Sequence, residues 1–334
     1  MRRAVLVLCA ALLVPAPRAG AADRVKVGLL KFATNGPTFI ALEKGYFAEQ
    51  GIDASLVYFD AAQPIAVAAV SGDIDVGVTG VAAGFYNLAG KGALAIIAAQ
   101  SREEPGYANN AILISNHAWD AGLRAYKDLG GHSVAVTTIG SPTHYAIGVI
   151  ADKEGIPLDS IRVVPVQTNS NQVSAVAGGQ IDAGVIPATL AIPMLQRNEA
   201  HLLGWAGDEV SWQLGAIFVK KSMIAAHRKL LESYIAAYRR AAREFYDAFL
   251  TKGPDGTLQQ GAEAPQLLAI LAKYLGQKPE QVKAGIAFVD PDGRLLVEDI
   301  YRQIAWYKAH GMVDKDVDAA TILDLSFTDG PYPR

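Results

Sequence analysis

Cysteine is almost absent from this sequence. Cys9 is the only cysteine in 334 residues, and it lies in an N-terminal stretch, residues 1–21, that we expect to be cleaved off. A mature chain without cysteine has no disulfide bonds, no thiolate catalysis and no cysteine metal site. It also has no thiol to protect in an oxidising compartment.

The pattern of residues 1–21 is the reason to expect cleavage. Two arginines precede a short apolar run over residues 4–14, and small residues up to Ala21 offer a cleavage site. This order is typical of a secretory signal, and the run is shorter than the roughly 20 residues that span a bilayer. Leu8 stands where a lipid-attachment site needs a small residue, which argues against a lipid anchor at Cys9. We therefore expect export to the periplasm with cleavage near Ala21.

The sequence also lacks an excess of positive charge. It has 30 Lys and Arg residues against 33 Asp and Glu. Residues 1–21 hold three arginines and no acid, so the mature chain keeps 30 − 3 = 27 basic residues and a formal net charge of −6. Nucleic-acid binding needs a basic footprint, so nucleic acid is not an expected partner. No second long apolar run follows, and we expect a soluble mature protein that is a monomer.

Motifs of catalysis and nucleotide binding are missing as well. The sequence has no Gly-x-Gly-x-x-Gly after its first expected strand, no phosphate-binding loop, no His-x-x-x-His pair and no Ser/His/Asp order. A nicotinamide or nucleotide enzyme is therefore poorly supported. We expect no cofactor, no metal and no catalytic turnover.

The sequence does contain an internal repeat of one short motif. Residues 72–78 read Gly-Asp-Ile-Asp-Val-Gly-Val, and residues 179–185 read Gly-Gln-Ile-Asp-Ala-Gly-Val, which places Asp75 and Asp182 107 positions apart. This interval is too long for a solenoid repeat and fits two similar α/β lobes with a cleft between them. Each aspartate follows a helix-ending glycine at the start of a strand, away from the cleft. We expect both to bond the preceding turn and to have no catalytic role.

Strand and helix signals alternate in both halves of the chain. Apolar stretches are followed by helical patterns that begin near proline or serine and end at glycine. This alternation is typical of a parallel sheet covered by helices on both faces. The expected strands are residues 25–30, 52–59, 74–79, 93–99, 133–137, 161–166, 181–186 and 201–205.

Two further strands are expected to connect the lobes. Residues 111–115 leave the first lobe and residues 216–220 return to it, and the strongest helical pattern, over 223–250, follows the return. A mostly helical tail after a second crossing can pack back on the first lobe. The expected organisation is a signal peptide at 1–21, a first lobe of 22–110 plus 219–334 and a second lobe of 111–218, joined by a two-crossing hinge.

The candidate site follows from where ligands bind in open α/β sheets. They lie beyond the carboxyl ends of strands, where helix starts offer N–H groups that bind anions without a counter-charge. The alternative role of each Ser, Thr or Asn at these positions is to cap its own helix. Trp212 is included as an aromatic wall, with core packing as its alternative. The expected ligand-binding residues are Phe32, Thr34, Thr38, Asp60, Gln63, Thr79, Gly80, Ser141, Thr143, His144, Gln167, Asn169, Pro187 and Trp212.

Three short motifs carry a resemblance to a known family. Residues 41–47 read Ala-Leu-Glu-Lys-Gly-Tyr-Phe and are followed by Gly-Ile-Asp at 51–53. Residues 70–75 read Val-Ser-Gly-Asp-Ile-Asp, with a counterpart at 178–182, and residues 141–145 read Ser-Pro-Thr-His-Tyr. Together these motifs resemble the periplasmic substrate-binding proteins of the sulfonate, taurine, nitrate and thiamine-precursor type. In taurine and sulfonate receptors the helix start that residues 141–145 resemble faces the acidic group of the ligand.

The resemblance implies a type II periplasmic binding fold and a receptor that passes a small ligand to the permease and ATPase subunits of an ABC importer. Gly215 stands where aminosulfonate receptors have an acid, which argues against taurine. A sulfonate or carboxylate without an amine, aliphatic or aromatic, fits better. The alternatives are a receptor for a thiamine pyrimidine precursor, an enzyme of the same fold, and a receptor that feeds a sensor kinase.

Overall fold

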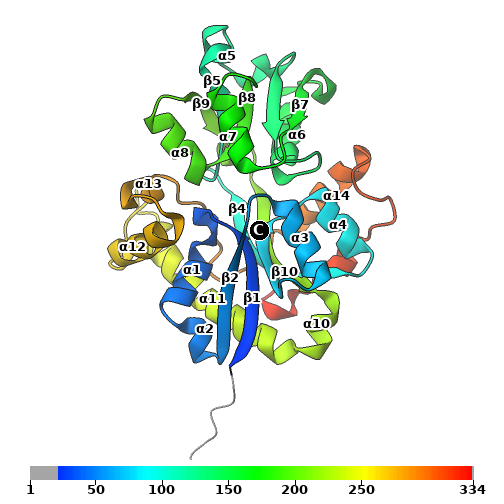
Figure 1. Cartoon of the computed structure of the whole chain (residues 1–334), viewed down its shortest axis with the longest axis vertical. Helices are drawn as coiled ribbons and strands as arrows, with labels where there is room; N and C mark the ends of the chain where they lie inside the picture. The colour runs from blue at the N-terminus through cyan, green and yellow to red at the C-terminus, as the bar shows by residue number, and fades with distance from the viewer. Residues whose placement is uncertain (1–21, 333–334) are drawn as a thin grey trace, which may run out of the picture.

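The computed structural model describes residues 22–332, which form two α/β lobes stacked along the long axis of the molecule (Figure 1). The expected signal peptide and Cys9 fall within residues 1–21 and so lie outside the described residues. Each lobe is built on one five-stranded sheet. The predicted two-lobed α/β architecture is therefore confirmed. Within the described residues, no helix is both long and apolar enough to cross a membrane.

The first lobe contains a mixed sheet with strand order β2-β1-β3-β10-β4. β1 pairs in parallel with β2 and β3, whereas β10 runs antiparallel to both β3 and β4. The sheet is therefore not wholly parallel, because the returning strand enters it in the opposite direction. Its strands are β1 (Asp23–Leu30), β2 (Ile52–Phe59), β3 (Val76–Gly80), β4 (Leu94–Glu103) and β10 (Trp212–Lys220).

The second lobe repeats this arrangement with the order β7-β6-β8-β5-β9. β6 is parallel to β7 and β8, and β5, the strand that arrives from the first lobe, is antiparallel to β8 and β9. Each sheet thus includes the strand in which the chain arrives from the other lobe, β10 in the first lobe and β5 in the second. The strands are β5 (Asn110–Ser115), β6 (Ser133–Val136), β7 (Arg162–Pro165), β8 (Ala183–Pro187) and β9 (Ala200–Trp205).

The two copies of the internal repeat form the same hydrogen bond, one in each lobe. Asp75 Oδ2 accepts the backbone N–H of Lys26 at 2.8 Å, and Asp182 Oδ2 accepts the backbone N–H of Ser133 at 2.8 Å. In the first lobe the aspartate before β3 holds β1, and in the second lobe the aspartate before β8 holds the start of β6. The predicted place of both aspartates, at the start of a strand, is confirmed, but the predicted bond to the preceding turn is wrong, because each carboxylate bonds the neighbouring strand.

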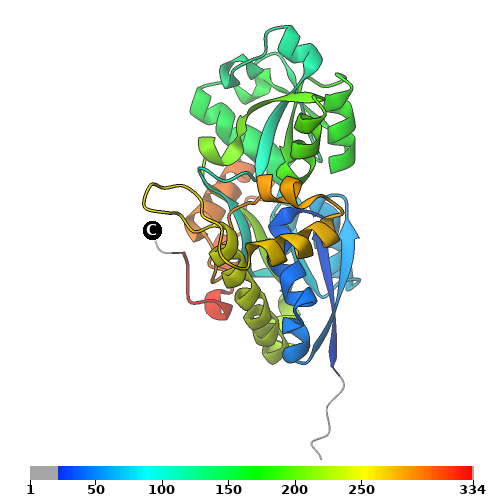
Figure 2. The same ribbon diagram turned by 90° about the vertical axis from the view of Figure 1, so that its left-hand side faces the viewer.

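Helices cover both faces of each sheet (Figures 1 and 2). In the first lobe they are α1 (Gly36–Glu43), α2 (Tyr46–Glu49), α3 (Ala62–Ser71) and α4 (Ala83–Gly90). In the second lobe they are α5 (Asn116–Asp120), α6 (Pro142–Glu154), α7 (Asn169–Ala177), α8 (Ala188–Gln196) and α9 (Ala206–Glu209).

The helical tail returns to the first lobe, as predicted. α11 packs along α1, and the apolar side chains Phe39, Tyr234 and Phe245 lie in one buried core with strands β1 and β3. The predicted helix over 223–250 is divided at His227, where the backbone leaves helical geometry. The tail consists of α10 (Lys221–Ala226), α11 (Arg228–Phe249), α12 (Ala264–Leu275), α13 (Pro279–Ala284) and α14 (Val297–Ala309).

The return to the first lobe occurs earlier in the chain than the expected boundary between residues 218 and 219. β10 pairs with β4 from its first residue, with Trp212 opposite Glu103. The boundary drawn from the sequence therefore falls inside a strand of the first sheet. The end of β4 contains polar residues such as Arg102 and Glu103, and for this reason its sequence resembles a loop. In the structure these residues pair with β10 as far as the hinge.

Candidate ligand-binding cleft

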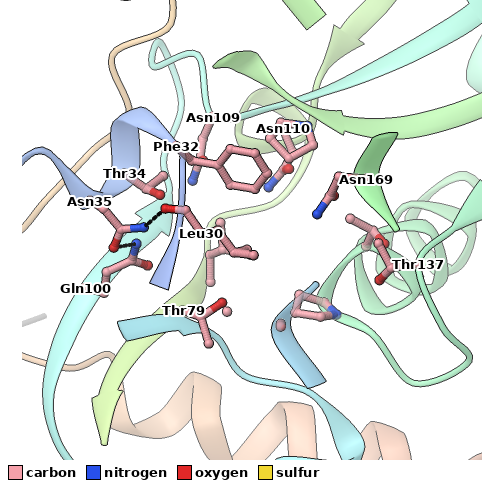
Figure 3. A pocket seen from close by; sticks show the side chains of 16 residues that line it. Leu30, Phe32, Thr34, Asn35, Thr79, Gln100, Asn109, Asn110, Thr137 and Asn169 are labelled. Carbon is pink, nitrogen blue, oxygen red and sulfur yellow. Dashed lines mark hydrogen bonds between the residues drawn. The ribbon is translucent and has the colours of Figure 1, made fainter. Parts of the chain in front are cut away.

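A cavity of about 60 Å³ lies where the two lobes meet (Figure 3). Strand ends and helix starts of both lobes line it, as the rule for open α/β sheets predicts. Seven of the expected site residues are among the lining residues: Phe32, Thr34, Thr79, Gly80, Thr143, Asn169 and Pro187. The other lining residues are Leu30, Asn35, Ala62, Gln100, Asn109, Asn110, Thr137, Pro142 and Leu214.

The first-lobe wall is positioned by the ends of β1 and β3. Phe32 and Thr34 follow β1 in the turn that leads into α1, and Thr79 and Gly80 end β3. Gly80 faces the second lobe so closely that a Cβ atom there would lie 2.9 Å from Cγ of Pro142. A side chain at position 80 would therefore push the lobes apart at the edge of the cavity.

Thr79 has a polar group that the protein itself does not use. The residue is 2% exposed, and its Oγ1 atom has no hydrogen-bond partner among the described residues. Figure 3 shows this oxygen pointing toward the middle of the cavity. Because a buried hydroxyl without a partner costs about 1–3 kcal/mol, its position favours a ligand that completes the hydrogen bond.

The second-lobe wall includes the start of α6. Ser141 is the N-cap of this helix, and its Oγ accepts the backbone N–H of His144 at 3.2 Å. The same Oγ lies 3.0 Å from Oγ1 of Thr143, which lines the cavity. Ser141 thus caps its own helix, which was the alternative to ligand binding, while Thr143 is the residue that reaches the cavity.

His144 lies behind this wall. Its Nδ1 accepts the backbone N–H of Gly140 at 3.0 Å, its ring meets Trp306 edge-on, and the residue is 4% exposed. Burial, with a smaller contribution from His310, lowers the pKa of His144 to about 4. The imidazole is therefore neutral at pH 7 and adds no positive charge to the cavity.

The remaining expected residues also lie outside the lining. Thr38 is fully buried in α1, beside Tyr234 of α11, and Trp212 is buried edge-on against Tyr145. Gln63 packs beside Gly84 of α4, and the side chain of Gln167 is exposed. Trp212 was expected to form an aromatic wall of the site or to pack in the core, and the structure places it in the core.

Asp60 contributes its backbone and not its carboxylate. Its side chain is exposed, and its carbonyl oxygen accepts the Nδ2 of Asn169 at 2.8 Å and the backbone N–H of Asn169 at 3.2 Å. Other hydrogen bonds also join the lobes, among them Ala33 N–H to Thr189 Oγ1 at 3.0 Å and Ala83 N–H to the Gly140 carbonyl at 2.9 Å. The lobes therefore meet on more than one side of the cavity.

Sequence reasoning missed the amide residues of the hinge and of β4. Gln100 donates from Nε2 to Oδ1 of Asn35 at 3.0 Å, and Asn35 donates from Nδ2 to the carbonyl of Leu30 at 2.7 Å (Figure 3). Asn109 and Asn110 line the cavity where the first crossing enters β5. The available signal was a run of uncharged polar residues at the ends of two apolar strands.

The lining contains no charged side chain. Its polar groups are threonine hydroxyls and side-chain amides, together with backbone N–H groups at helix starts, which can hold an anion or a neutral polar group. Within residues 22–332 there is also no cluster of three or more His, Cys, Asp or Glu residues that could hold a metal ion.

Comparisons with known proteins show the family and the fold of this chain. The chain matches the family model described as NMT1/THI5 like over residues 34–248. No curated protein matches the sequence. Among solved structures, the alkanesulfonate-binding protein SsuA from Xanthomonas axonopodis pv. citri, bound to MOPS, has a TM-score of 0.73 at 19% identity, covering 92% of this chain and 100% of that chain.

Two further structures are similar. The periplasmic aliphatic sulphonate-binding protein SsuA from Escherichia coli has a TM-score of 0.70 at 17% identity, covering 93% of this chain and 94% of that chain. The periplasmic nitrate-binding protein NrtA from Synechocystis PCC 6803 has a TM-score of 0.71 at 13% identity, covering 92% of this chain and 87% of that chain. The chain therefore belongs to the NMT1/THI5-like family and has the fold of periplasmic substrate-binding proteins.

Proposed function

We propose that this protein is a periplasmic solute receptor that encloses a small organic anion, a sulfonate or a carboxylate, and delivers it to the permease and ATPase subunits of an ABC importer. The observation that carries the proposal is the cavity between the lobes, lined by residues of both. A ligand bound there contacts both lobes at once, so it stabilises their closed arrangement by a hinge motion.

The start of α6 supports an acidic group as part of the ligand. Pro142 has no N–H, and the N–H of His144 is used by the Ser141 cap, which leaves the N–H of Thr143 for the cavity. Unpaired N–H groups at a helix start carry the positive end of the helix dipole. They bind anions without a lysine or arginine, in keeping with the uncharged lining.

A neutral heterocycle of the thiamine-pyrimidine-precursor type is the second candidate. The specific observation in its favour is that the lining combines the ring of Phe32 with several side-chain amides and no charged side chain. Amides pair with the donor and acceptor edge of a heterocycle, and an aromatic ring stacks on its face.

A thermal-shift screen of the purified mature protein separates these candidates. The panel contains methanesulfonate, benzenesulfonate, benzoate, nitrate and 4-amino-5-hydroxymethyl-2-methylpyrimidine. A ligand that binds only the folded state raises stability by about 2.7 kcal/mol at a hundredfold excess over its Kd. We expect the organic sulfonates or carboxylates to stabilise the protein. A response to the pyrimidine alone would replace the first candidate with the second.

Thr143→Val tests whether the responding compound binds in the cavity. The change keeps the shape of the side chain and removes its hydroxyl, which costs a buried ligand oxygen about 1–3 kcal/mol. Thr328→Val is the matched control, because Thr328 is a partly buried threonine in the tail, away from the cleft. Equal titration calorimetry results for the two variants would contradict the proposed contact between Thr143 and the ligand.

The proposal also includes the absence of turnover. No nucleophile–base pair is expected from the sequence, and a mature chain without cysteine lacks the cysteine-rich motif that resemblance to the pyrimidine synthase of this fold would require. Mass spectrometry of the compound after prolonged incubation with the protein should recover it unchanged. Recovery of a chemically altered compound would show that the protein is an enzyme.

A separate experiment distinguishes a transport receptor from one that feeds a sensor kinase. It measures whether uptake of the compound into vesicles that contain the importer depends on ATP and on this protein.

A further inference from the structure

A carboxyl group is buried in the hinge beside the cavity. Glu103 is the last residue of β4 and is 0% exposed. Its Oε1 accepts the Nδ2 of Asn110, the first residue of β5, at 2.6 Å. Its Oε2 has no hydrogen-bond partner within the described part of the chain. Because Asn110 lines the cavity, this one hydrogen bond connects the hinge to the proposed ligand site.

Both crossings of the hinge surround this carboxyl group. On the second crossing, Gly207 of α9 lies against the first, so that a Cβ atom there would be 2.7 Å from the carbonyl oxygen of Glu104. Asp208, the next residue, accepts the backbone N–H of Gly106 at 2.8 Å. The carboxyl of Glu103 therefore lies between two segments that must both move if the lobes open.

The charged groups nearby do not neutralise Glu103. Arg102 points to the other face of the strand, where its guanidinium lies between the rings of Phe288 and Tyr332, at 4.1 and 3.9 Å from their centroids. Arg102 Nε pairs with Glu104 Oε2 at 3.0 Å. Asp208 adds negative charge on the second crossing. Among residues 22–332, no ion pair to Glu103 is formed.

The environment brings the ionisation of Glu103 into the neutral range. Burial raises the pKa of Glu103 to about 8. The side-chain amide of Asn110 and the nearby backbone N–H groups of Asn110 and Gly207 oppose this rise, and the charge of Asp208 adds to it. The group therefore exchanges its proton over a pH range in which the folded protein can be studied.

We propose that Glu103 is a proton-dependent positioning residue that sets which end of the Asn110 amide faces the ligand. A carboxylate can only accept hydrogen bonds, so in the ionised form it holds the NH₂ group of Asn110 and leaves Oδ1 for the cavity. When the carboxyl takes up a proton from solvent, it gains an O–H donor that pairs with Oδ1. The amide then turns its NH₂ group to the cavity.

The consequence for binding rests on the proposed function. An anion accepts hydrogen bonds and donates none, so it binds best when Asn110 presents its NH₂ group, which is the protonated state of Glu103. A neutral heterocycle with an N–H donor prefers the ionised state, in which Oδ1 is available. The protonation of one buried hinge residue thus selects between the two ligand classes.

Nuclear magnetic resonance of the ligand-free mature protein, labelled with ¹⁵N-asparagine, tests the proposal. Asn110→Ser identifies the side-chain signals of Asn110 by their loss. We expect these signals to titrate between pH 6 and 10 with a midpoint near 8. A downfield ¹H shift should appear at high pH, where an N–H donates to a carboxylate. In Glu103→Gln the titration should disappear, and in the matched control Glu104→Gln it should remain.

Two results would overturn the proposal. One is an Asn110 signal that stays constant across this pH range in the wild-type protein. The other is a titration that persists in Glu103→Gln, because the proton would then bind elsewhere. No ligand takes part in the measurement, so a failed ligand screen leaves the test valid, and a failed test leaves the proposed receptor function in place.

Discussion

Thr79 is the residue at which stability and binding are expected to oppose each other. Its buried hydroxyl has no partner among the described residues and points into the cavity. Inside the ligand-free protein such a group lowers stability, because it has lost its hydrogen bonds to water. With a ligand present, the same group gains a hydrogen bond.

Thr79→Val should therefore leave the free energy of unfolding of the ligand-free protein unchanged or raise it, while weakening ligand binding by about 1–3 kcal/mol. Urea denaturation measures the first quantity, and titration calorimetry on the compound from the screen measures the second. Loss of stability with unchanged affinity would mean that the hydroxyl supports the fold and does not touch the ligand.

Glu103 is expected to lower the stability of the protein as the pH rises. In the folded state its pKa is raised from 4.5 to about 8. Between these values the folded protein holds a proton that the unfolded chain has released, so stability falls as pH rises through this window. The full penalty, on the order of 3–5 kcal/mol at 1.36 kcal/mol per pKa unit, is present above pH 8.

Glu103→Gln removes this titration while keeping a group that bonds Asn110. The variant should gain stability over the wild-type protein progressively from pH 5 to pH 8, as followed by urea denaturation at each pH. Glu104→Gln, at a residue that pairs with Arg102, is the control. A stability difference between Glu103→Gln and wild type that does not change with pH would contradict the assignment of the raised pKa to Glu103.

The lining of the cavity could be predicted from the sequence only in part, for physical reasons. Strand ends are visible as patterns, and this is why Phe32, Thr79 and Thr143 were expected at the cavity. The rotation of a helix about its axis is set by packing, and this turned His144 toward Trp306. Asn110 was missed because its place depends on the path of the hinge, which no local pattern records.

At the scale of elements, α14 holds the second lobe from the side of the first. Trp306 packs on α6 so closely that a Cβ atom at Gly148 would lie 2.0 Å from its Cζ2. The hydroxyl of Tyr307, one residue further on, donates to the carbonyl of Ser141 at 3.1 Å. The tail therefore supports the helix whose first turn forms one wall of the cavity.

Gly148→Ala should destabilise the protein by about 1–3 kcal/mol, because the added methyl group forces Trp306 out of its place. In the Trp306→Ala background the same change should cost much less, since the indole is gone. A double-mutant cycle by chemical denaturation measures this coupling. Equal costs in both backgrounds would show that Gly148 is needed for a reason other than its contact with α14.

The order of the elements was more predictable than their bounds. The repeated aspartate marked the same place in both sheets, because it makes the same hydrogen bond to the neighbouring parallel strand, β1 in the first lobe and β6 in the second. The hinge ends of β4 and β10 were predicted too short. The last residues of β4, Arg102 and Glu103, are polar but pair with the first residues of β10, and pairing between segments about 110 positions apart leaves no local pattern in either.

At the scale of the whole molecule, the exported protein should be a monomer without its leader. Residues 1–21 carry the pattern of a cleaved signal, and the mature chain would begin near Ala22. Native mass spectrometry of the periplasmic protein reports both its N-terminus and its oligomeric state. A lipid-modified chain that retains Cys9, or a stable dimer, would contradict this expectation.

A crystal structure of the mature protein with the compound that the screen identifies tests most directly whether the cleft binds the ligand. We expect one unchanged molecule in the cavity between the lobes. Its acidic group should lie within hydrogen-bonding distance of Thr143, and it should contact Thr79 and Phe32. A molecule bound on the outer surface of either lobe, with the cavity holding only water, would show that the cleft is not the ligand site.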